Sequence, residues 1–433
     1  MKRIFLTGAT GVMGSHGLRE LSSYPERYEI TVLARNSKKN RRLLLPFMSR
    51  GVKVIWGDLL DKEAVARGVS DADIVLHVGG MVSPAADWFP EKTMETNVKS
   101  IENIIQAALP RKNEVRIVYV GSVSQYGSRL APNHWGSCAD ELKMTPFDAY
   151  AYSKIKSERL LIESGIKWWV SLRQTGILHS GLLQKADDPI MFHVPLKGVL
   201  EWVTAEDSGR VLERVCRDDI PDDFWRKCYN LGGGEKFRLT NYEFECKLLD
   251  AMGCPAPEKI FETNWFATDN FHGVWFADSD KLEEVLKFRS GDSPSEYFHK
   301  MKKELPWYFS LAPLAPSFII KLFMKKVANK PVLGPLWWIK NNVARRISAA
   351  WGSKEEWERI PDWPQFDLRR PTENHEIAED IHADDGAEHL IHVRCDRCGE
   401  EYEIKKIAYA FGHRCPKCLE IFKNEILEKK GSD

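Results

Sequence analysis

Ser122, Tyr150 and Lys154 have side chains that can together move a proton to or from a substrate oxygen. Tyr150 and Lys154 are four residues apart, so a helix here would place both on one face. A phenol with its ordinary pKa of about 10 is a poor base at neutral pH, and a nearby ammonium favours the phenolate and lowers that pKa. Ser122, after an apolar run, could hold the oxygen in line. The three residues indicate acid–base chemistry at a carbonyl or hydroxyl group, which needs a hydride-carrying cofactor to complete a redox reaction at the carbon.

A glycine-rich turn near the start of the chain would hold such a cofactor. The stretch from Thr7 to Gly14 follows the apolar residues 4–6 and precedes a helical pattern. Gly8 permits a sharp turn, Gly11 lets the backbone approach a pyrophosphate, and Gly14 lets the helix pack on the strand, while free N–H groups at the helix start attract the anion. The spacing is one residue longer than the Gly-x-Gly fingerprint, and a purely structural turn is the alternative.

Strand-like and helical patterns then alternate along the first half of the chain. This alternation predicts an α/β fold with a doubly wound parallel sheet, in which ligands bind at the carboxyl ends of the strands. A helix is expected from Phe89 to Leu109, carrying Asn97. The strands are expected at residues 29–34, 52–56, 74–80, 115–120 and 170–176.

The end of the second strand indicates which nicotinamide cofactor is used. Arg35 stands where an acidic residue would bind the ribose hydroxyls of NAD, and Lys38, Lys39 and Arg41 follow. This cationic segment favours the additional phosphate of NADP, with NAD as the other possibility and a solvated loop as the plain alternative. Asp58 could accept a hydrogen bond from the adenine amino group.

Five motifs in this order resemble the extended short-chain dehydrogenase/reductase family, the NAD(P)-dependent epimerase/dehydratase group. They are residues 7–14, 57–59, 77–80, 121–127 and 150–154, and the resemblance covers about the first two-thirds of the chain. It implies a Rossmann-type fold, catalysis by Ser122, Tyr150 and Lys154, and a homodimer. The cofactor-binding residues it implies are Thr7, Gly8, Thr10, Gly11, Val12, Met13, Gly14, Arg35, Asp58, Leu59, His77, Val78, Gly79, Gly80, Asn97, Tyr150, Lys154, Gln174 and Thr175.

The resemblance leaves several reactions open. Sugar-nucleotide dehydratases of the family carry an acidic pair after the catalytic hydroxyl, where this chain has Val123 and Ser124, so dehydration is disfavoured. Hydride transfer between NADP(H) and a bulky carbonyl or alcohol is the leading hypothesis. Epimerisation of a nucleotide sugar with bound NAD is the second, and a cofactor-sensing or scaffold protein the third. The expected substrate-binding residues are Met81, Val82, Ser124, Gln125, His134, Trp135, Phe192 and His193.

Length and charge limit the remaining possibilities. With 433 residues the chain is expected to form two or three domains, and its 62 basic and 62 acidic residues give no electrostatic case for nucleic acid. The first strand starts too early to leave room for a secretory signal, and no apolar run is long enough for a membrane span. We therefore expect a soluble, cytoplasmic protein.

The last third of the chain departs from the family pattern. Domain boundaries are expected at residues 1–289 for the dinucleotide-binding domain, with a substrate lobe mainly at 176–289, then 290–372 for a Trp-rich helical extension and 373–388 for an acidic linker. The extension is expected to cover the lobe or form a dimer contact. A lysine-lined apolar helix near residues 317–327 leaves peripheral membrane contact as a less favoured alternative.

Four cysteines close to the C-terminus predict a metal site. Cys395 and Cys398 form one Cys-x-x-Cys pair, and Cys415 and Cys418 form a second one 16 residues further on. This spacing is typical of a zinc ribbon, here at residues 389–425, whose four thiolates would fill the zinc shell and make the ion structural. A rubredoxin-like iron site is the minority alternative.

Overall fold

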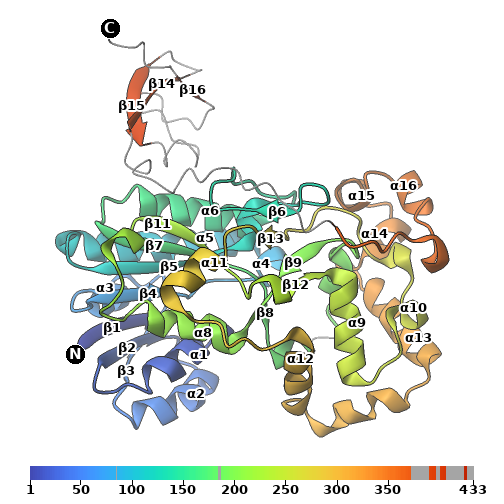
Figure 1. Ribbon diagram of the computed structural model, residues 1–433, viewed down its shortest axis with the longest axis horizontal. Helices are drawn as coiled ribbons and strands as arrows, with labels where there is room; N and C mark the ends of the chain where they lie inside the picture. The colour runs from blue at the N-terminus through green and yellow to red at the C-terminus, as the bar shows by residue number, and fades with distance from the viewer. Residues whose placement is uncertain (84, 184–186, 372–389, 396–399, 406–423, 427–433) are drawn as a thin grey trace.

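A seven-stranded parallel sheet organises the protein in this computed structural model (Figure 1). The structure describes residues 1–83, 85–183, 187–371, 390–395, 400–405 and 424–426. The strand order is β3-β2-β1-β4-β5-β7-β11, so the chain reverses direction across the sheet between β1 and β4. The strands are β1 (Lys2–Thr7), β2 (Tyr28–Ala34), β3 (Lys53–Trp56), β4 (Ile74–His77), β5 (Arg116–Ser122), β7 (Trp168–Gln174) and β11 (Lys227–Leu231).

Helices cover both faces of this sheet, as expected for a doubly wound fold. On one face α1 (Val12–Leu21) packs against α8 (Ala205–Arg214), and on the other α5 (Pro90–Ala108) packs against α3 (Lys62–Val69) and α6 (Ala149–Ile162). Helices α1 and α8 are close because Gly17 has no side chain: a Cβ there would lie 2.4 Å from the Leu212 side chain. Helix α2 (Lys38–Met48) connects β2 to β3. The expected sheet and the expected helix near Phe89 are therefore confirmed.

Two strand ends differ from the sequence expectation in a way that matters for the site. β4 stops at His77, before the glycines, while β5 continues through Gly121 and Ser122. Ser122 is also the N-cap of the short 3-10 helix η2 (Val123–Tyr126) and accepts a hydrogen bond from the backbone of Ser124. The serine is thus fixed by the sheet on one side and by this turn on the other.

The substrate lobe is built from short elements around helix α9 (Asn241–Met252). Thr240 caps this helix with a reciprocal capping box to Glu243. The remaining short elements before residue 290 belong partly to the lobe and partly to the sheet domain: α4 (Ala85–Trp88), η1 (Leu109–Arg111), β6 (Trp135–Gly136), β8 (Ile177–Leu178), α7 (Ser180–Leu183), η3 (Pro189–His193), β9 (Val199–Glu201), β10 (Val203–Thr204), η4 (Asp222–Phe224), η5 (Glu235–Phe237), β12 (Arg238–Thr240), α10 (Pro257–Ile260), η6 (Thr263–Trp265), β13 (Trp275–Phe276) and α11 (Asp280–Leu286).

The Trp-rich extension packs on the lobe through its indole rings. Trp351, Trp357 and Trp363 each donate a ring N–H to a backbone carbonyl between Phe261 and Phe266, at 2.8–2.9 Å. Because both the rings and their N–H groups are satisfied, these tryptophans fix the extension to the lobe. Its elements are α12 (Pro294–Lys303), η7 (Trp307–Leu314), α13 (Ser317–Ala328), α14 (Pro335–Lys340), α15 (Ala344–Trp351), α16 (Lys354–Glu358) and η8 (Trp363–Gln365).

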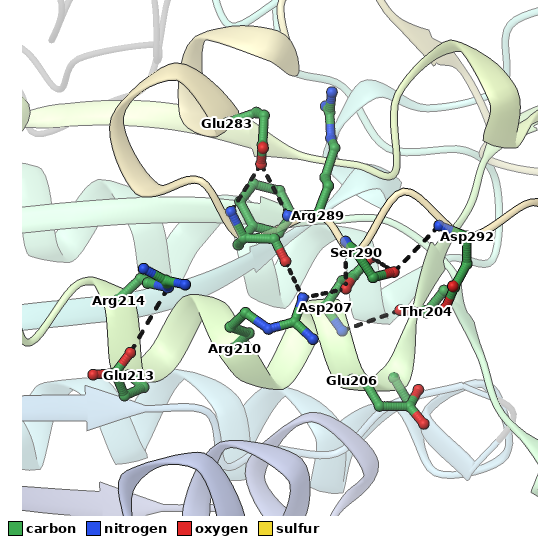
Figure 2. A network of polar contacts seen from close by, with 12 residues as sticks. Thr204, Glu206, Asp207, Arg210, Glu213, Arg214, Glu283, Arg289, Ser290 and Asp292 are labelled. Atoms are coloured by element: carbon green, nitrogen blue, oxygen red, sulfur yellow. Dashed lines mark hydrogen bonds and ion pairs between the residues drawn. The ribbon is translucent and has the colours of Figure 1, made fainter. Parts of the chain in front are cut away.

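A polar network joins the start of the extension to the sheet domain (Figure 2). Asp207 on α8 accepts hydrogen bonds from the Arg210 guanidinium and from the backbone N–H and hydroxyl of Ser290. Glu283 accepts the backbone N–H groups of Phe288 and Arg289. These hydrogen bonds hold the segment around residue 290 against α8.

The C-terminal module contributes a three-stranded sheet of order β15-β14-β16. It consists of β14 (Leu390–Cys395), β15 (Glu401–Lys405) and β16 (Asn424–Ile426). Cys395 is the last residue of β14, whereas Cys398, Cys415, Cys418 and the linker 373–388 lie outside the described residues. Within the described ranges, no cluster of His, Cys, Asp or Glu could hold a metal ion, and no helix is long and apolar enough to cross a membrane.

Candidate active site

The glycine turn at the end of β1 is shaped by close backbone contacts. Gly8 has a φ of +76°, and a Cβ there would lie 2.6 Å from the backbone nitrogen of Gly79. A Cβ on Gly14 would lie 2.2 Å from the Gly8 carbonyl oxygen. Only glycine fits at both positions, because the β1 turn, the β4 loop and α1 meet there.

The N-terminus of α1 is open to an anion. Gly11 is its N-cap, provides no side-chain hydrogen bond to the first turn, and no acidic residue stands in that turn. Apart from the chain neighbours of Gly11, the nearest atom to a Cβ on this residue would be the Gly8 carbonyl oxygen, at 3.4 Å. Gly11 therefore leaves an approach to the free N–H groups. Unsatisfied N–H groups at a helix start bind phosphate, so these residues fit a dinucleotide.

A cavity of about 1820 Å³ extends from this turn into the substrate lobe. It passes the carboxyl ends of β1, β4 and β5, the position at which open α/β sheets bind ligands. Most of the predicted cofactor residues line it: Gly8, Thr10, Gly11, Val12, Met13, Gly14, Arg35, Asp58, Leu59, Val78, Gly79, Gly80, Tyr150, Lys154, Gln174 and Thr175.

Three predicted cofactor residues lie behind the wall instead. Thr7 accepts the backbone N–H of Gly79 at 3.1 Å and lies 2.9 Å from Nδ1 of His77. Asn97 bonds both backbone groups of Met81, accepting its N–H at 2.7 Å and donating to its carbonyl at 3.0 Å. These buried polar residues hold the loop after β4, so their role here is to position the backbone that faces the cavity.

The burial of His77 fixes its charge state. Burial and the nearby Lys154 ammonium lower the pKa of His77 to about 3. The imidazole is therefore neutral at physiological pH and adds no positive charge to the site.

Ser122 lines the cavity with its hydroxyl oriented by the neighbouring turn. Its Oγ accepts hydrogen bonds from the backbone N–H of Ser124 at 3.2 Å and from the Ser124 hydroxyl at 3.0 Å. Gln125 accepts the Ser122 N–H at 2.7 Å. Both Oγ contacts use lone pairs, so the Ser122 proton is available for a ligand oxygen.

Helix α6 brings Tyr150 and Lys154 to the same cavity. The Lys154 ammonium lies 5.8 Å from the Tyr150 ring centroid and donates a hydrogen bond to the Val120 carbonyl at 2.7 Å. Burial lowers the pKa of Lys154 to about 8, against the opposing effect of Glu158. The ammonium is still mostly protonated at neutral pH and lies on the face of α6 shared with the phenol.

The N-terminus of α6 is held by a residue pair that the sequence motifs do not include. Asp148 caps the helix by accepting the Ala151 N–H at 2.8 Å, and its second oxygen lies 3.0 Å from Nδ1 of His272. Burial acts to raise the pKa of Asp148, but the hydrogen bonds and charge of its partners outweigh it and the pKa is lowered. His272, which lines the cavity, thus steadies the helix that carries Tyr150.

A fully buried ion pair lies under the same helix. Arg173 and Glu158 are completely buried and 2.9 Å apart, and Glu158 also accepts the Ser171 hydroxyl at 2.5 Å. The Arg173 guanidinium also donates a hydrogen bond to the Tyr126 hydroxyl oxygen at 2.9 Å. This network joins α6 to β7 and to the turn after Ser122.

The predicted substrate residues divide into two groups. Met81 and Val82 line the cavity. Ser124 and Gln125 are fully buried behind Ser122, His134 and Trp135 pack against Trp275, and Phe192 belongs to the aromatic core of the lobe. His193 lies on Trp338 and next to the Leu333 carbonyl at 2.9 Å, with its pKa lowered to about 4 by burial. Aromatic and histidine side chains in this lobe chiefly build its core, which periodicity alone does not reveal.

Glu245 is a cavity residue that the sequence motifs did not indicate. It is buried, its Oε2 has no hydrogen-bond partner among the described residues, and burial raises its pKa to about 8. Its neighbours in the wall include Phe244, Leu248 and Leu249, all on α9. The signal for it in the sequence is a carboxyl spaced three and four residues before Leu248 and Leu249, which places it on an apolar face if the segment is a helix.

The seven-stranded parallel sheet forms a Rossmann-type α/β fold, and the cavity lies at the strand ends where such folds bind ligands. Residues 4–169 match the model of the NAD dependent epimerase/dehydratase family. A dTDP-glucose 4,6-dehydratase from Bacillus anthracis, solved in complex with NAD, superimposes with a TM-score of 0.56 at 14% identity, over 71% of this chain and 96% of that one. Together, these matches support an enzyme that is similar to that family over residues 4–169.

Curated relatives show the same kind of similarity. The low-salt glycan biosynthesis protein Agl12 of Haloferax volcanii is 25% identical over 272 residues, which is 58% of this chain and 82% of the relative. An inverting UDP-N-acetylglucosamine 4,6-dehydratase of Campylobacter jejuni is 29% identical over 107 residues, 24% of this chain, and the match spans only 32% of that relative's length. The family model likewise matches only residues 4–169, the part of the chain that carries the glycine turn.

Proposed function

We propose that this protein is an NAD(P)-dependent oxidoreductase of the extended short-chain type that acts on a bulky carbonyl or alcohol. The observation that carries the proposal is the meeting of Ser122, Tyr150 and Lys154 in one cavity with an uncapped helix N-terminus. A bound nicotinamide would supply the hydride chemistry. Tyr150 exchanges the proton with the substrate oxygen, Ser122 donates a hydrogen bond to that oxygen, and Lys154 favours the phenolate.

NADP is the cofactor we propose, with NAD as the alternative. Arg35 directly follows β2 and lines the cavity together with Ser37, Lys39 and Asn40. A cationic, hydrogen-bonding rim at this position suits a 2′-phosphate. The NAD in the related Bacillus structure supports the alternative.

An epimerase that uses the same three residues is the second candidate, because the matching family includes epimerases. Dehydration is less well supported, since Val123 lines the cavity and Ser124 is buried where an acidic pair would be required. The two remaining activities differ in turnover, because an oxidoreductase consumes its cofactor and an epimerase regenerates it.

Steady-state turnover with a panel of aldehydes, ketones and nucleotide sugars tests the proposal. We expect net oxidation of NADPH with at least one carbonyl compound, and a loss of about 10²-fold or more in Tyr150→Phe. Isomerised sugar without net cofactor consumption would favour the epimerase. Equal rates in wild type and Tyr150→Phe on every substrate would remove the catalytic assignment.

For the C-terminal module we propose a structural zinc ion held by Cys395, Cys398, Cys415 and Cys418. The support is their paired spacing in the sequence. We expect one zinc per chain by elemental analysis, lost when all four are changed to Ser. Unchanged zinc content in that variant would refute the site, and bound iron would favour the rubredoxin-like alternative.

A further inference from the structure

Helix α13 presents an apolar face that the other residues described by the structure do not cover. Its opposite face is buried through Met324, Val327 and Ala328 in the lobe core. Phe318 and Leu322, one turn apart, are 62% and 65% exposed, and Leu314 in the preceding segment is 77% exposed. Large exposed apolar side chains grouped on one surface mark an interaction site.

The same surface is positively charged. Lys325 and Lys326 are exposed and form no ion pair among the described residues, whereas Lys321 pairs with Glu262. The wheel of an α-helix places Lys326 between the exposed apolar positions and Lys325 at their edge. Long lysine stems extend over apolar surface while their ammonium groups reach outward, which suits an interface of hydrocarbon and anionic head groups.

The position of α13 in the molecule also favours an interaction at this surface. In Figure 1, α12 and α13 lie at the lower right margin of the molecule, with the connecting segment along the edge. Phe323 is 50% exposed and also lines the cavity, together with Ile320 and with Phe309 of the preceding segment. The lobe end of the cavity therefore reaches the exposed face of α13.

We propose that the surface formed by Leu311, Leu314 and the exposed face of α13 docks on an anionic lipid bilayer, with the lobe end of the cavity next to the membrane. The apolar side chains enter the boundary between head groups and acyl chains, and Lys325 and Lys326 contact lipid phosphates. Such docking would give the cavity access to a substrate that carries a long apolar chain. A second copy of this chain is the competing occupant, but it would bring the same lysines to the contact.

Co-sedimentation of the purified full chain with lipid vesicles tests this docking, and it does not depend on the proposed redox chemistry. We expect binding to vesicles that contain phosphatidylglycerol, weakening with salt, and much less binding to pure phosphatidylcholine. Phe318→Ser combined with Leu322→Ser should lower the partition constant about tenfold or more. Lys325→Gln and Lys326→Gln should each lower it about fivefold.

A matched variant separates docking from general apolar exposure. Leu43→Ser with Leu45→Ser removes two exposed leucines from the basic helix α2 and should leave vesicle binding unchanged. Thermal unfolding establishes that each variant is folded. The proposal is overturned if the wild type does not bind anionic vesicles, if the α2 variant loses binding equally, or if sedimentation velocity shows a dimer that the α13 variant dissociates and vesicles are not bound.

Discussion

The two ends of the cavity differ in polarity. The sheet end of the cavity is lined by the glycine turn, by the N-terminus of α1, and by Ser122, Tyr150 and Lys154. At the lobe end, the wall is formed by Phe244, Leu248 and other apolar residues, together with the buried carboxyl of Glu245, whose Oε2 has no hydrogen-bond partner among the described residues. The polar end is suited to hold a cofactor and transfer a proton, whereas the apolar end is suited to select a ligand by desolvation.

The largest expected effect falls on the polar end. Lys154→Met removes the ammonium 5.8 Å from the Tyr150 ring and should reduce kcat by about 10²-fold or more, because the phenolate loses its stabilising charge. The pH profile of kcat should shift to higher pH. Lys156→Met, a change two residues away on α6, serves as the control, and an unaltered rate in Lys154→Met would contradict the assignment.

The ion pair beneath α6 should dominate stability. Arg173→Met leaves Glu158 as a buried, unpaired charge and should lower the free energy of unfolding by about 3–5 kcal/mol. Chemical denaturation measures this loss. The double variant Arg173→Met with Glu158→Gln should recover part of it, since no uncompensated charge is left, and a double variant that is less stable than the single one would argue against this explanation.

At the apolar end, the expected effect depends on pH. The pKa of Glu245 is about 8 in the folded protein against an ordinary value of 4.5, so between these values the folded state retains a proton that the unfolded state releases. The contribution of the Glu245 proton to the free energy of unfolding is therefore complete below about pH 4.5 and is lost as the pH rises towards 8. One pKa unit corresponds to about 1.4 kcal/mol, so the decline amounts to several kcal/mol.

Glu245→Gln removes this titration, and its unfolding temperature should exceed that of the wild type by more at pH 8 than at pH 5. Differential scanning calorimetry at both pH values gives the comparison. Glu284→Gln, at an exposed position on α11, is the control. Parallel stability curves for wild type and Glu245→Gln would mean that Glu245 is paired or hydrated in solution.

The smallest expected effect concerns cofactor choice. Arg35→Asp replaces the cation at the end of β2 and should weaken NADP about tenfold relative to NAD, about 1.4 kcal/mol. Competitive titration of the two cofactors measures this ratio. A wild type that prefers NAD would instead show that the basic residues after β2 form a solvated loop.

The contrast between the two ends also explains what the sequence could reveal. The sheet end depends on local features such as the glycine turn and the Tyr150–Lys154 spacing, so the parallel sheet and the residues facing the turn were predictable. The lobe end is assembled from α9, η7 and α13, which are distant in sequence. Phe192 and His134 have types suited to a pocket, but long-range packing buries them. The pairing of Asp148 with His272 likewise joins residues 124 positions apart.

Calorimetric titration of NADP and NAD into the full chain is the sharpest test of dinucleotide binding at the glycine turn. Gly11 has φ −85° and ψ 176°, a conformation open to any residue, so Gly11→Val should fold while its side chain occupies the approach to the helix N-terminus. We expect one dinucleotide per wild-type chain and at least about tenfold weaker binding in Gly11→Val. Absence of binding by the wild type, or equal affinity in the two proteins, would contradict it.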